Sequence, residues 1–174
     1  MSDLRYPIGQ FEHQGEVTEQ ELERWLGQIE ALPGAVREAV AGLTDEQLDT
    51  PYRPDGWTIR QVVHHVPDSH LNSYVRFKWA LTEDTPAIKT YDEALWAELA
   101  DYRTVPVETS LDFLEVLHRK WIGLLRSLTP EQWSRRFAHP EWGKVDLATT
   151  AGIYAWHGRH HLAHITTTAE RLGW

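Results

Sequence analysis

Histidine is the residue type whose number and spacing stand out in this chain. Its 174 residues include ten histidines and no cysteine. Seven of the ten fall in two short windows, which contain His64, His65, His70, His157, His160, His161 and His164. Neutral imidazole nitrogen is a common ligand of zinc and of several other divalent metals. The two windows therefore favour metal-assisted chemistry.

The second window has the spacing of ligands on one face of a helix. Side chains three or four residues apart meet on the same face. Both His157 with His161 and His160 with His164 satisfy that spacing, and spacing alone does not choose between the pairs. A catalytic zinc site commonly has three protein ligands and one open position. The third imidazole could come from the first window, because ligands in a helix bundle project from facing helices.

Other catalytic templates are absent from the sequence. There is no Gly-x-Ser-x-Gly elbow, no Gly-Lys-Thr phosphate loop and no Gly-x-Gly-x-x-Gly turn. The His-Glu-x-x-His pattern of many zinc proteases is also missing, since Gly158 follows His157. Metal assistance is the chemistry that remains, and without cysteine any reacting thiol must come from a cosubstrate.

The charge balance argues against polyanionic partners. Lys and Arg number 17 against 26 Asp and Glu, which gives a formal net charge of −9. Nucleic acids and anionic membranes bind through cationic side chains, so neither is an expected partner. The sequence has no apolar run long enough to span a bilayer, and its first residues lack a basic segment followed by an apolar one. We therefore expect a cytoplasmic protein.

Apolar periodicity predicts an all-α fold. Apolar residues recur at helical spacing in long segments near 18–42, 58–82, 110–128 and 147–172. A threonine followed three residues later by Glu or Gln marks a helix start, and this pattern occurs at Thr18, Thr44 and Thr58. Strand patterns are scarce, so we predict a four-helix bundle with long, decorated connections.

The segments outside the four helices, and two prolines inside them, add further expectations. We expect residues 1–16 to form an irregular arm, and the whole chain, 1–174, to form a single domain. Residues 134–146 could form a small hairpin or an irregular loop. Pro33 lies inside the first long helix, where the loss of a backbone donor predicts a kink or a break. Pro67 lies inside the second long helix and frees the carbonyl of Val63.

The chain resembles the DinB-like superfamily and, within it, the YfiT group of metal-dependent hydrolases. The resemblance rests on two specific blocks, GWTIRQVVHH at 56–65 and the terminal block that combines WH at 156–157 with HHLAHI at 160–165. Less specific matches include YPIG at 6–9, LDTPYR at 48–53 and TPAI at 85–88. They extend the resemblance over nearly the whole chain.

The resemblance implies a four-helix bundle with a three-histidine site that binds zinc or nickel, in a homodimer. Matched residue by residue, the ligand on the second long helix is the second histidine of the pair, His65. On the last helix the ligands are His157, which follows Trp156, and His161. His64, His160 and His164 then either support the ligands from outside or have a structural role, without binding the metal.

Two reactions fit such a site. The first is transfer of a low-molecular-weight, bacillithiol-like thiol to an electrophile, and the second is hydrolysis by metal-activated water. A metal-binding or stress-response module without turnover is a third possibility. Asp68, one turn after His65, is a candidate for orienting an imidazole, and equally for a solvated or helix-capping carboxylate. The expected partners are a small thiol with an electrophile, or a small hydrolysable substrate.

Overall fold

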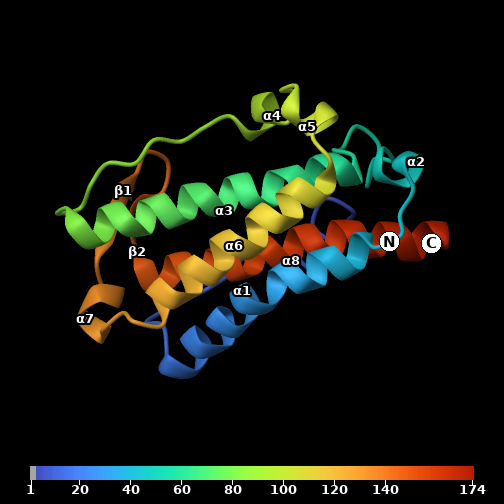
Figure 1. Ribbon diagram of the computed structural model, residues 1–174. Coiled ribbons are helices and arrows are strands. Elements are labelled where there is room, and N and C mark those ends of the chain that lie inside the picture. The colour runs from blue at the N-terminus through green and yellow to red at the C-terminus, as the bar shows by residue number, and fades with distance from the viewer. Residues whose placement is uncertain (1–2) are drawn as a thin grey trace.

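The computed structural model describes residues 3–174 and contains the predicted bundle (Figure 1). The described residues form four long helices, α1 (Glu19–Val40), α3 (Ile59–Thr82), α6 (Val107–Leu125) and α8 (Leu147–Leu172). α1 contacts α6 and α8, and α3 contacts the same two helices. The prediction of a four-helix bundle is thus confirmed. Because α3 and α8 are neighbours, the two histidine windows can meet.

Short elements make up the connections. They are α2 (Asp45–Leu48), α4 (Glu93–Trp96), α5 (Asp101–Thr104), α7 (Pro130–Trp133), β1 (Arg136–His139) and β2 (Gly143–Asp146). The two strands pair antiparallel, with Phe137 opposite Val145, so residues 134–146 include a hairpin. Gly143 begins β2 with a φ of 73°, a left-handed conformation that allows the chain to reverse. α4 and α5 lie over α3 in Figure 1.

The start of one helix differs from its prediction. α6 begins at Val107, three residues before the predicted start at Ser110. Pro106 is the N-cap and has a φ of −59°, which suits the entrance to a helix. The first turn therefore forms without a side chain that caps it, so this helix start has no N-cap signal in the sequence.

The break considered at Pro33 does not occur. α1 runs without interruption through Pro33, and α3 runs through Pro67. An internal proline leaves the carbonyl four residues earlier without its usual donor, and that carbonyl then needs another partner. The carbonyl oxygen of Ile29 has one, because it lies 2.7 Å from Nδ1 of His118 on α6. A contact with a neighbouring helix thus replaces the lost backbone hydrogen bond.

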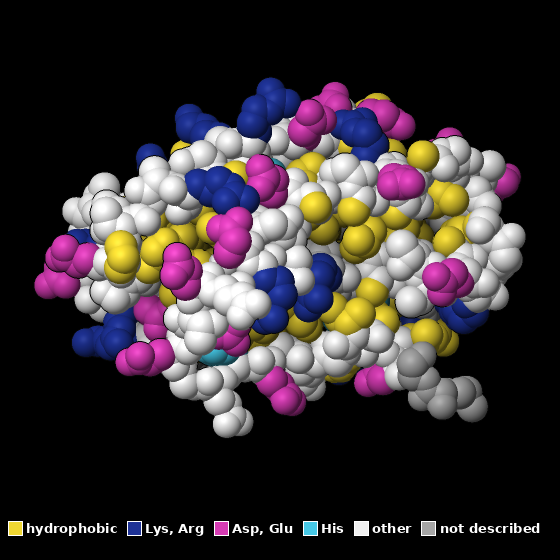
Figure 2. All heavy atoms as spheres, turned by 90° about the horizontal axis from the view of Figure 1, so that it is seen from below, with side chains coloured by type: hydrophobic (Ala, Val, Ile, Leu, Met, Phe, Trp, Pro, Cys, Tyr) yellow, Lys and Arg dark blue, Asp and Glu magenta, His cyan; other side chains and the backbone are white. Residues whose placement is uncertain are grey.

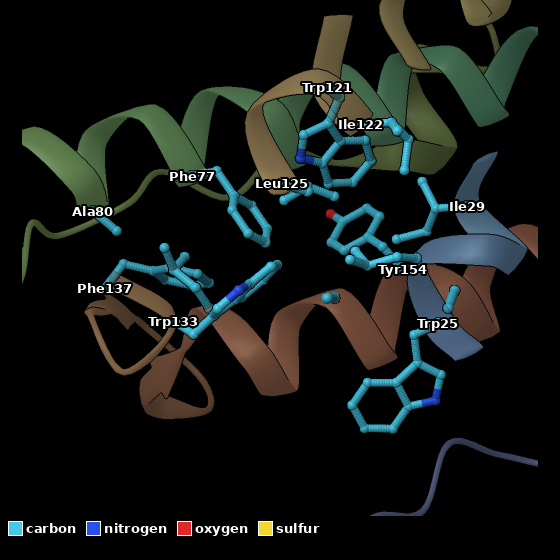
Figure 3. Packing of buried hydrophobic residues seen from close by; sticks show 14 of the residues in the cluster. Trp25, Ile29, Phe77, Ala80, Trp121, Ile122, Leu125, Trp133, Phe137 and Tyr154 are labelled. Atoms are coloured by element: carbon cyan, nitrogen blue, oxygen red, sulfur yellow. The ribbon is translucent and has the colours of Figure 1, made fainter. Parts of the chain in front are cut away.

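Aromatic packing fixes the helices around the histidines. Trp121 of α6 and Phe77 of α3 are fully buried and meet edge to face, with ring centroids 5.6 Å apart. Tyr154 of α8 packs against the same Trp121, with ring centroids 5.9 Å apart. Figure 3 shows both rings within the core. Full burial of a large apolar side chain contributes about 1.5–3 kcal/mol. These contacts hold α3, α6 and α8 in one register.

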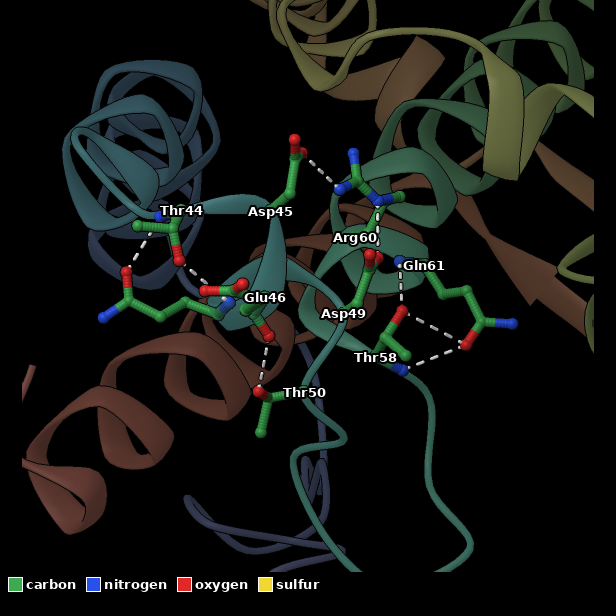
Figure 4. A network of polar contacts seen from close by, with 9 residues as sticks. Thr44, Asp45, Glu46, Asp49, Thr50, Thr58, Arg60 and Gln61 are labelled. Carbon is green, nitrogen blue, oxygen red and sulfur yellow. Dashed lines mark hydrogen bonds and ion pairs between the residues drawn. The ribbon is translucent and has the colours of Figure 1, made fainter.

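Polar contacts fix the beginning of α3 (Figure 4). Thr58 and Gln61 form the predicted capping box. Arg60 binds Asp49 through Nε and Asp45 through Nη2, each at 2.7 Å. The hydrogen bond to Asp49 is the main reason that the pKa of Arg60 rises above its usual value. α3 is thereby tied to the preceding α2 within a few residues of His65.

Charges of both signs are interspersed on the surface. Figure 2 shows Lys and Arg side chains among Asp and Glu side chains over the face seen from below. Within residues 3–174, none of the helices combines the length and the apolar character that a bilayer crossing requires.

Candidate metal centre

Three histidines from two helices converge inside the bundle. His65 lies on α3, and His157 and His161 lie one turn apart on α8. Each offers a ring nitrogen, and these nitrogens all lie within 4.8 Å of one another. Nε2 of His65 is 3.3 Å from Nε2 of His157. The structure therefore brings together the three residues that the resemblance implied.

The other histidines of the two windows have different partners. Nδ1 of His64 is 2.7 Å from a serine hydroxyl on α6. His160 stacks on the indole of Trp156, with ring centroids 4.6 Å apart. Nε2 of His164 is 3.2 Å from the carbonyl oxygen of Arg5 in the N-terminal arm. These contacts distinguish histidines that spacing alone could not.

Burial keeps the three converging imidazoles neutral. Desolvation lowers the pKa of His65 to about 3. It also lowers the pKa values of His157 and His161 well below the ordinary 6.5, and repulsion from neighbouring histidines acts in the same direction. At neutral pH each ring therefore keeps an unshared electron pair, which is the form that binds metals.

The donor set fits a divalent metal. Nδ1 of His65 is buried and has no hydrogen-bond partner among residues 3–174. The Nε2 atoms of His65 and His157 face each other, so one proton at most can lie between them. Three neutral imidazoles suit zinc, nickel, copper or iron. In the described part of the chain, no other group of three or more potential ligands comes together in this way.

Hydroxyl and aromatic groups lie beside the three rings. Oγ of Ser69, one turn after His65, is 3.3 Å from Nε2 of His157. Burial raises the pKa of Tyr91, which lies near Ser69, above its usual value, so the Tyr91 hydroxyl remains protonated. The half-buried ring of Trp57 lies 4.6 Å from that of His65. The site thus combines neutral donors with an aromatic wall.

Asp68 has a partner outside the centre. Its carboxylate accepts a hydrogen bond of 2.7 Å from the hydroxyl of Tyr102 on α5. Burial raises the pKa of Asp68, and the bond from Tyr102 opposes this rise. Among the described residues, no hydrogen bond joins Asp68 to an imidazole. This side chain therefore ties α5 to α3 rather than contacting a ring of the candidate centre.

Sequence reasoning missed His118 on α6. It is buried, and its Nε2 lies 2.8 Å from Nδ1 of His70. Nε2 of His70 in turn lies 3.2 Å from Nδ1 of His157. A single histidine in the apolar stripe of a helix resembles any packed core residue, so the sequence offers no signal for it.

Comparison with known proteins identifies the family. The family model of the DinB superfamily matches residues 28–165. The chain belongs to the DinB superfamily. Proteins named "Putative metal-dependent hydrolase" from Bacillus mycoides strain KBAB4 and Bacillus cereus strain 03BB102 are each 55% identical to this DinB-superfamily chain over 174 residues, which covers both chains fully. Relatives with such names support an enzyme at a general level.

Solved structures agree with this assignment. YfiT from Bacillus subtilis, described as "a probable metal-dependent hydrolase with an unusual four-helix bundle topology", is 48% identical, with a TM-score of 0.95 over 98% of both chains. TT2238, a four-helix bundle protein, has a TM-score of 0.55 over 81% of this chain and 94% of its own. At 18% identity TT2238 supports the fold alone. The predicted likeness to the DinB-like superfamily and its YfiT group is confirmed.

Proposed function

We propose that this DinB-superfamily protein is a metal-dependent enzyme that transfers a low-molecular-weight, bacillithiol-like thiol to small electrophiles. The proposal rests on the neutral imidazoles of His65, His157 and His161, of which the first and last are buried and His157 is half-buried. Within residues 3–174, no carboxylate joins this group. Ligands without charge leave the positive charge of a divalent metal undiminished.

A thiol is the nucleophile that suits such a centre best. A bound divalent metal supplies Lewis acidity that deprotonates a coordinating thiol or lowers the pKa of water. A free thiol has a pKa of about 8.5, far below that of water, so the thiol needs less help from a protein base. Transfer joins the thiol sulfur to an electrophilic carbon and releases the thiol proton and the leaving group.

The residues beside the centre bind and orient the reactants. The hydroxyl of Ser69, 3.3 Å from Nε2 of His157, can donate a hydrogen bond to a substrate oxygen or halogen beside that ring. The ring of Trp57, which lies against His65 and faces His161 at 6.2 Å, excludes water from one side of the site. Neither role requires a charged side chain.

The remaining parts of the proposal concern metal, assembly and location. We propose one divalent metal per chain, with zinc as the first candidate and nickel as the second, because both accept imidazole ligands. The proposed homodimer is what the resemblance to the family implies, and the cytoplasm is the location expected from the sequence. Small molecules are the proposed substrates, in keeping with the net charge of −9.

Hydrolysis is the second candidate function. The names of the relatives from Bacillus mycoides and Bacillus subtilis favour it. It would use the same three histidines, with water in place of the thiol. Because both reactions need the same ligands, only an assay of products separates them.

The test begins with protein of measured zinc content. The loaded protein is incubated with a panel of small thiols and monochlorobimane, and in parallel with ester and amide substrates. We expect fluorescent thiol conjugate from the wild type, none from His161→Ala, and wild-type activity from His139→Ala, which alters a buried histidine in the hairpin. Cleavage without thiol consumption would favour the hydrolase, and silence in both assays would favour a metal-binding module.

A further inference from the structure

A chain of hydrogen bonds crosses the bundle and ends at the candidate centre. It begins at the carbonyl oxygen of Ile29 on α1, 2.7 Å from Nδ1 of His118 on α6. Nε2 of His118 lies 2.8 Å from Nδ1 of His70 on α3. Nε2 of His70 lies 3.2 Å from Nδ1 of His157 on α8. This series of hydrogen bonds thus connects α1, α6, α3 and α8, in that order.

Pro33 explains why this chain can begin at Ile29. In an ordinary helix the carbonyl of Ile29 would accept the backbone N–H of residue 33, but proline has none. The carbonyl is therefore available to His118, although α1 continues past it. A carbonyl oxygen can only accept a hydrogen bond, so Nδ1 of His118 must be the donor.

Because Nδ1 of His118 must donate to Ile29, the position of every other proton in this series of hydrogen bonds is determined. His118 and His70 are both buried, and their hydrogen-bond partners are imidazoles and a carbonyl rather than carboxylates, so each ring is neutral and carries one N–H. Nε2 of His118 then has no proton and accepts from Nδ1 of His70. By the same reasoning Nε2 of His70 accepts from Nδ1 of His157, which leaves Nε2 of His157 unprotonated.

We propose that His118 and His70 are positioning residues that hold His157 in the tautomer whose Nε2 electron pair faces His65 and His161. The inference rests on the metal centre of the proposed function, but not on which nucleophile that centre activates. Ring nitrogens opposite a metal usually donate to a carboxylate, carbonyl or water, and this partner fixes the ring. Here two further imidazoles and a proline-freed carbonyl take that place.

His161, the other histidine that α8 contributes to the candidate centre, ends a shorter series of hydrogen bonds of the same kind. Nε2 of His164 lies 3.2 Å from the carbonyl of Arg5, so Nε2 is its donor. Nδ1 of His164 lies 3.4 Å from Nδ1 of His161 and accepts from it. Nε2 of His161 is then unprotonated as well. Both α8 histidines thus present Nε2, each through a chain that ends on a backbone carbonyl.

Aromatic packing shields the hydrogen bonds of His118 and His70 from water. The ring of Trp121 lies nearly perpendicular to those of His70 and His118, with centroid distances of 5.7 and 5.8 Å. Tyr154 meets His70 edge to face at 5.2 Å. Without competing water, these hydrogen bonds are stronger than they would be at the surface.

Imidazole nitrogen NMR of the metal-free wild type tests the proton positions directly. Long-range ¹H–¹⁵N correlations distinguish protonated from unprotonated ring nitrogens. We expect Nδ1–H at His118, His70, His157 and His161, and Nε2–H at His164. This pattern is diagnostic because neutral histidine in water favours Nε2–H. An Nε2–H signal from His157 would overturn the proposal without any variant.

Substitutions then test the effect on metal binding. His118→Phe removes both hydrogen bonds and keeps a ring, so we expect mixed tautomers at His157 and zinc affinity weakened about 10–100-fold. His118→Gln can donate to Ile29 and accept from His70, and should retain the tautomer. His139→Phe is the matched control and should bind zinc like the wild type.

The outcomes separate the two proposals. Wild-type tautomers and wild-type zinc affinity in His118→Phe would overturn the positioning role. Failure of the wild type to bind zinc would overturn the metal centre and the proposed function, while the NMR pattern would still report on the hydrogen-bond chain. If His118→Phe does not fold, the wild-type pattern decides.

Discussion

At the scale of residues, identical side chains acquire different roles from their neighbours. His64 and His65 are adjacent in sequence, yet one faces α6 and the other faces α8. Helical geometry turns successive side chains by about 100°. Only His65 can therefore meet the α8 histidines, although both rings are buried and both pKa values are lowered by burial.

This difference makes a paired prediction. His65→Asn should weaken zinc binding by more than about 100-fold, which exceeds the usual effect of a residue that only supports a ligand. His64→Asn should leave stoichiometric binding intact, because its ring contacts a serine hydroxyl outside the centre. Competition with a chromogenic chelator measures both affinities. Equal losses in the two variants would contradict the ligand assignment.

At the scale of elements, α1 and α8 approach closely next to His157 and His161. Gly158 lies between His157 and His161, and a Cβ placed on it would collide with the side chain of Leu32. Leu32 is itself buried. A glycine is therefore required here by packing rather than by backbone conformation, and the approach brings α8 to its position beside α3.

Gly158→Ala should therefore lower stability although alanine favours helices. Overpacking costs about 1–3 kcal/mol, against a helix-propensity gain of about 1 kcal/mol. Gly27→Ala on α1 is the control, because a Cβ there meets nothing within 4 Å, and it should stabilise by about 0.5–1 kcal/mol. Urea unfolding of the metal-free proteins measures both. If Gly158→Ala instead raised the free energy of unfolding, the side chain of Leu32 would have moved aside without loss of stability, contrary to this prediction.

At the scale of the whole molecule, the folded bundle contains an unusual number of neutral imidazoles. Within residues 3–174, burial lowers the pKa of nine of the ten histidines. In the unfolded chain the same rings titrate near 6.5. The folded protein thus binds fewer protons than the unfolded one in mildly acidic solution.

This difference gives stability a defined pH dependence. The stabilisation is fully present above pH 6.5 and is lost as the pH falls toward the folded values, about 4 for His118 and about 3 for His65. Each such histidine removes about 1.4 kcal/mol per pH unit. We expect the urea midpoint of metal-free protein to be nearly flat from pH 8 to 7 and to fall steeply below 6.5. An unchanged midpoint at pH 5 would contradict buried, neutral histidines.

Much of the architecture could be predicted from local signals. The capping boxes at Thr18, Thr44 and Thr58 begin helices as expected, and Gly173 ends α8 in a left-handed conformation. Such signals involve residues close in sequence. The start of α6 after Pro106 was mispredicted because no side chain caps it.

The candidate site was harder to predict from the sequence, because its contacts join residues that are distant along the chain. Spacing identified the windows, but only the resemblance selected His65, His157 and His161 before the structure brought them together. The link from Ile29 to His118 spans 89 residues. Pro33 was visible as a helix irregularity, but its consequence for a carbonyl depends on which helix packs against it.

The separation of the converging histidines also bears on how the protein is made. His65 and His157 are 92 residues apart, so at roughly 5–20 residues per second about 5–20 s of translation separate them. During that interval the growing chain on the ribosome exposes α3 without its later partner helix, and α1 lacks the surface of α8 on which it packs. The three histidines of the proposed metal centre therefore come together only when the last helix has emerged and docked, so a metal held by all three would bind after synthesis of the bundle rather than during it.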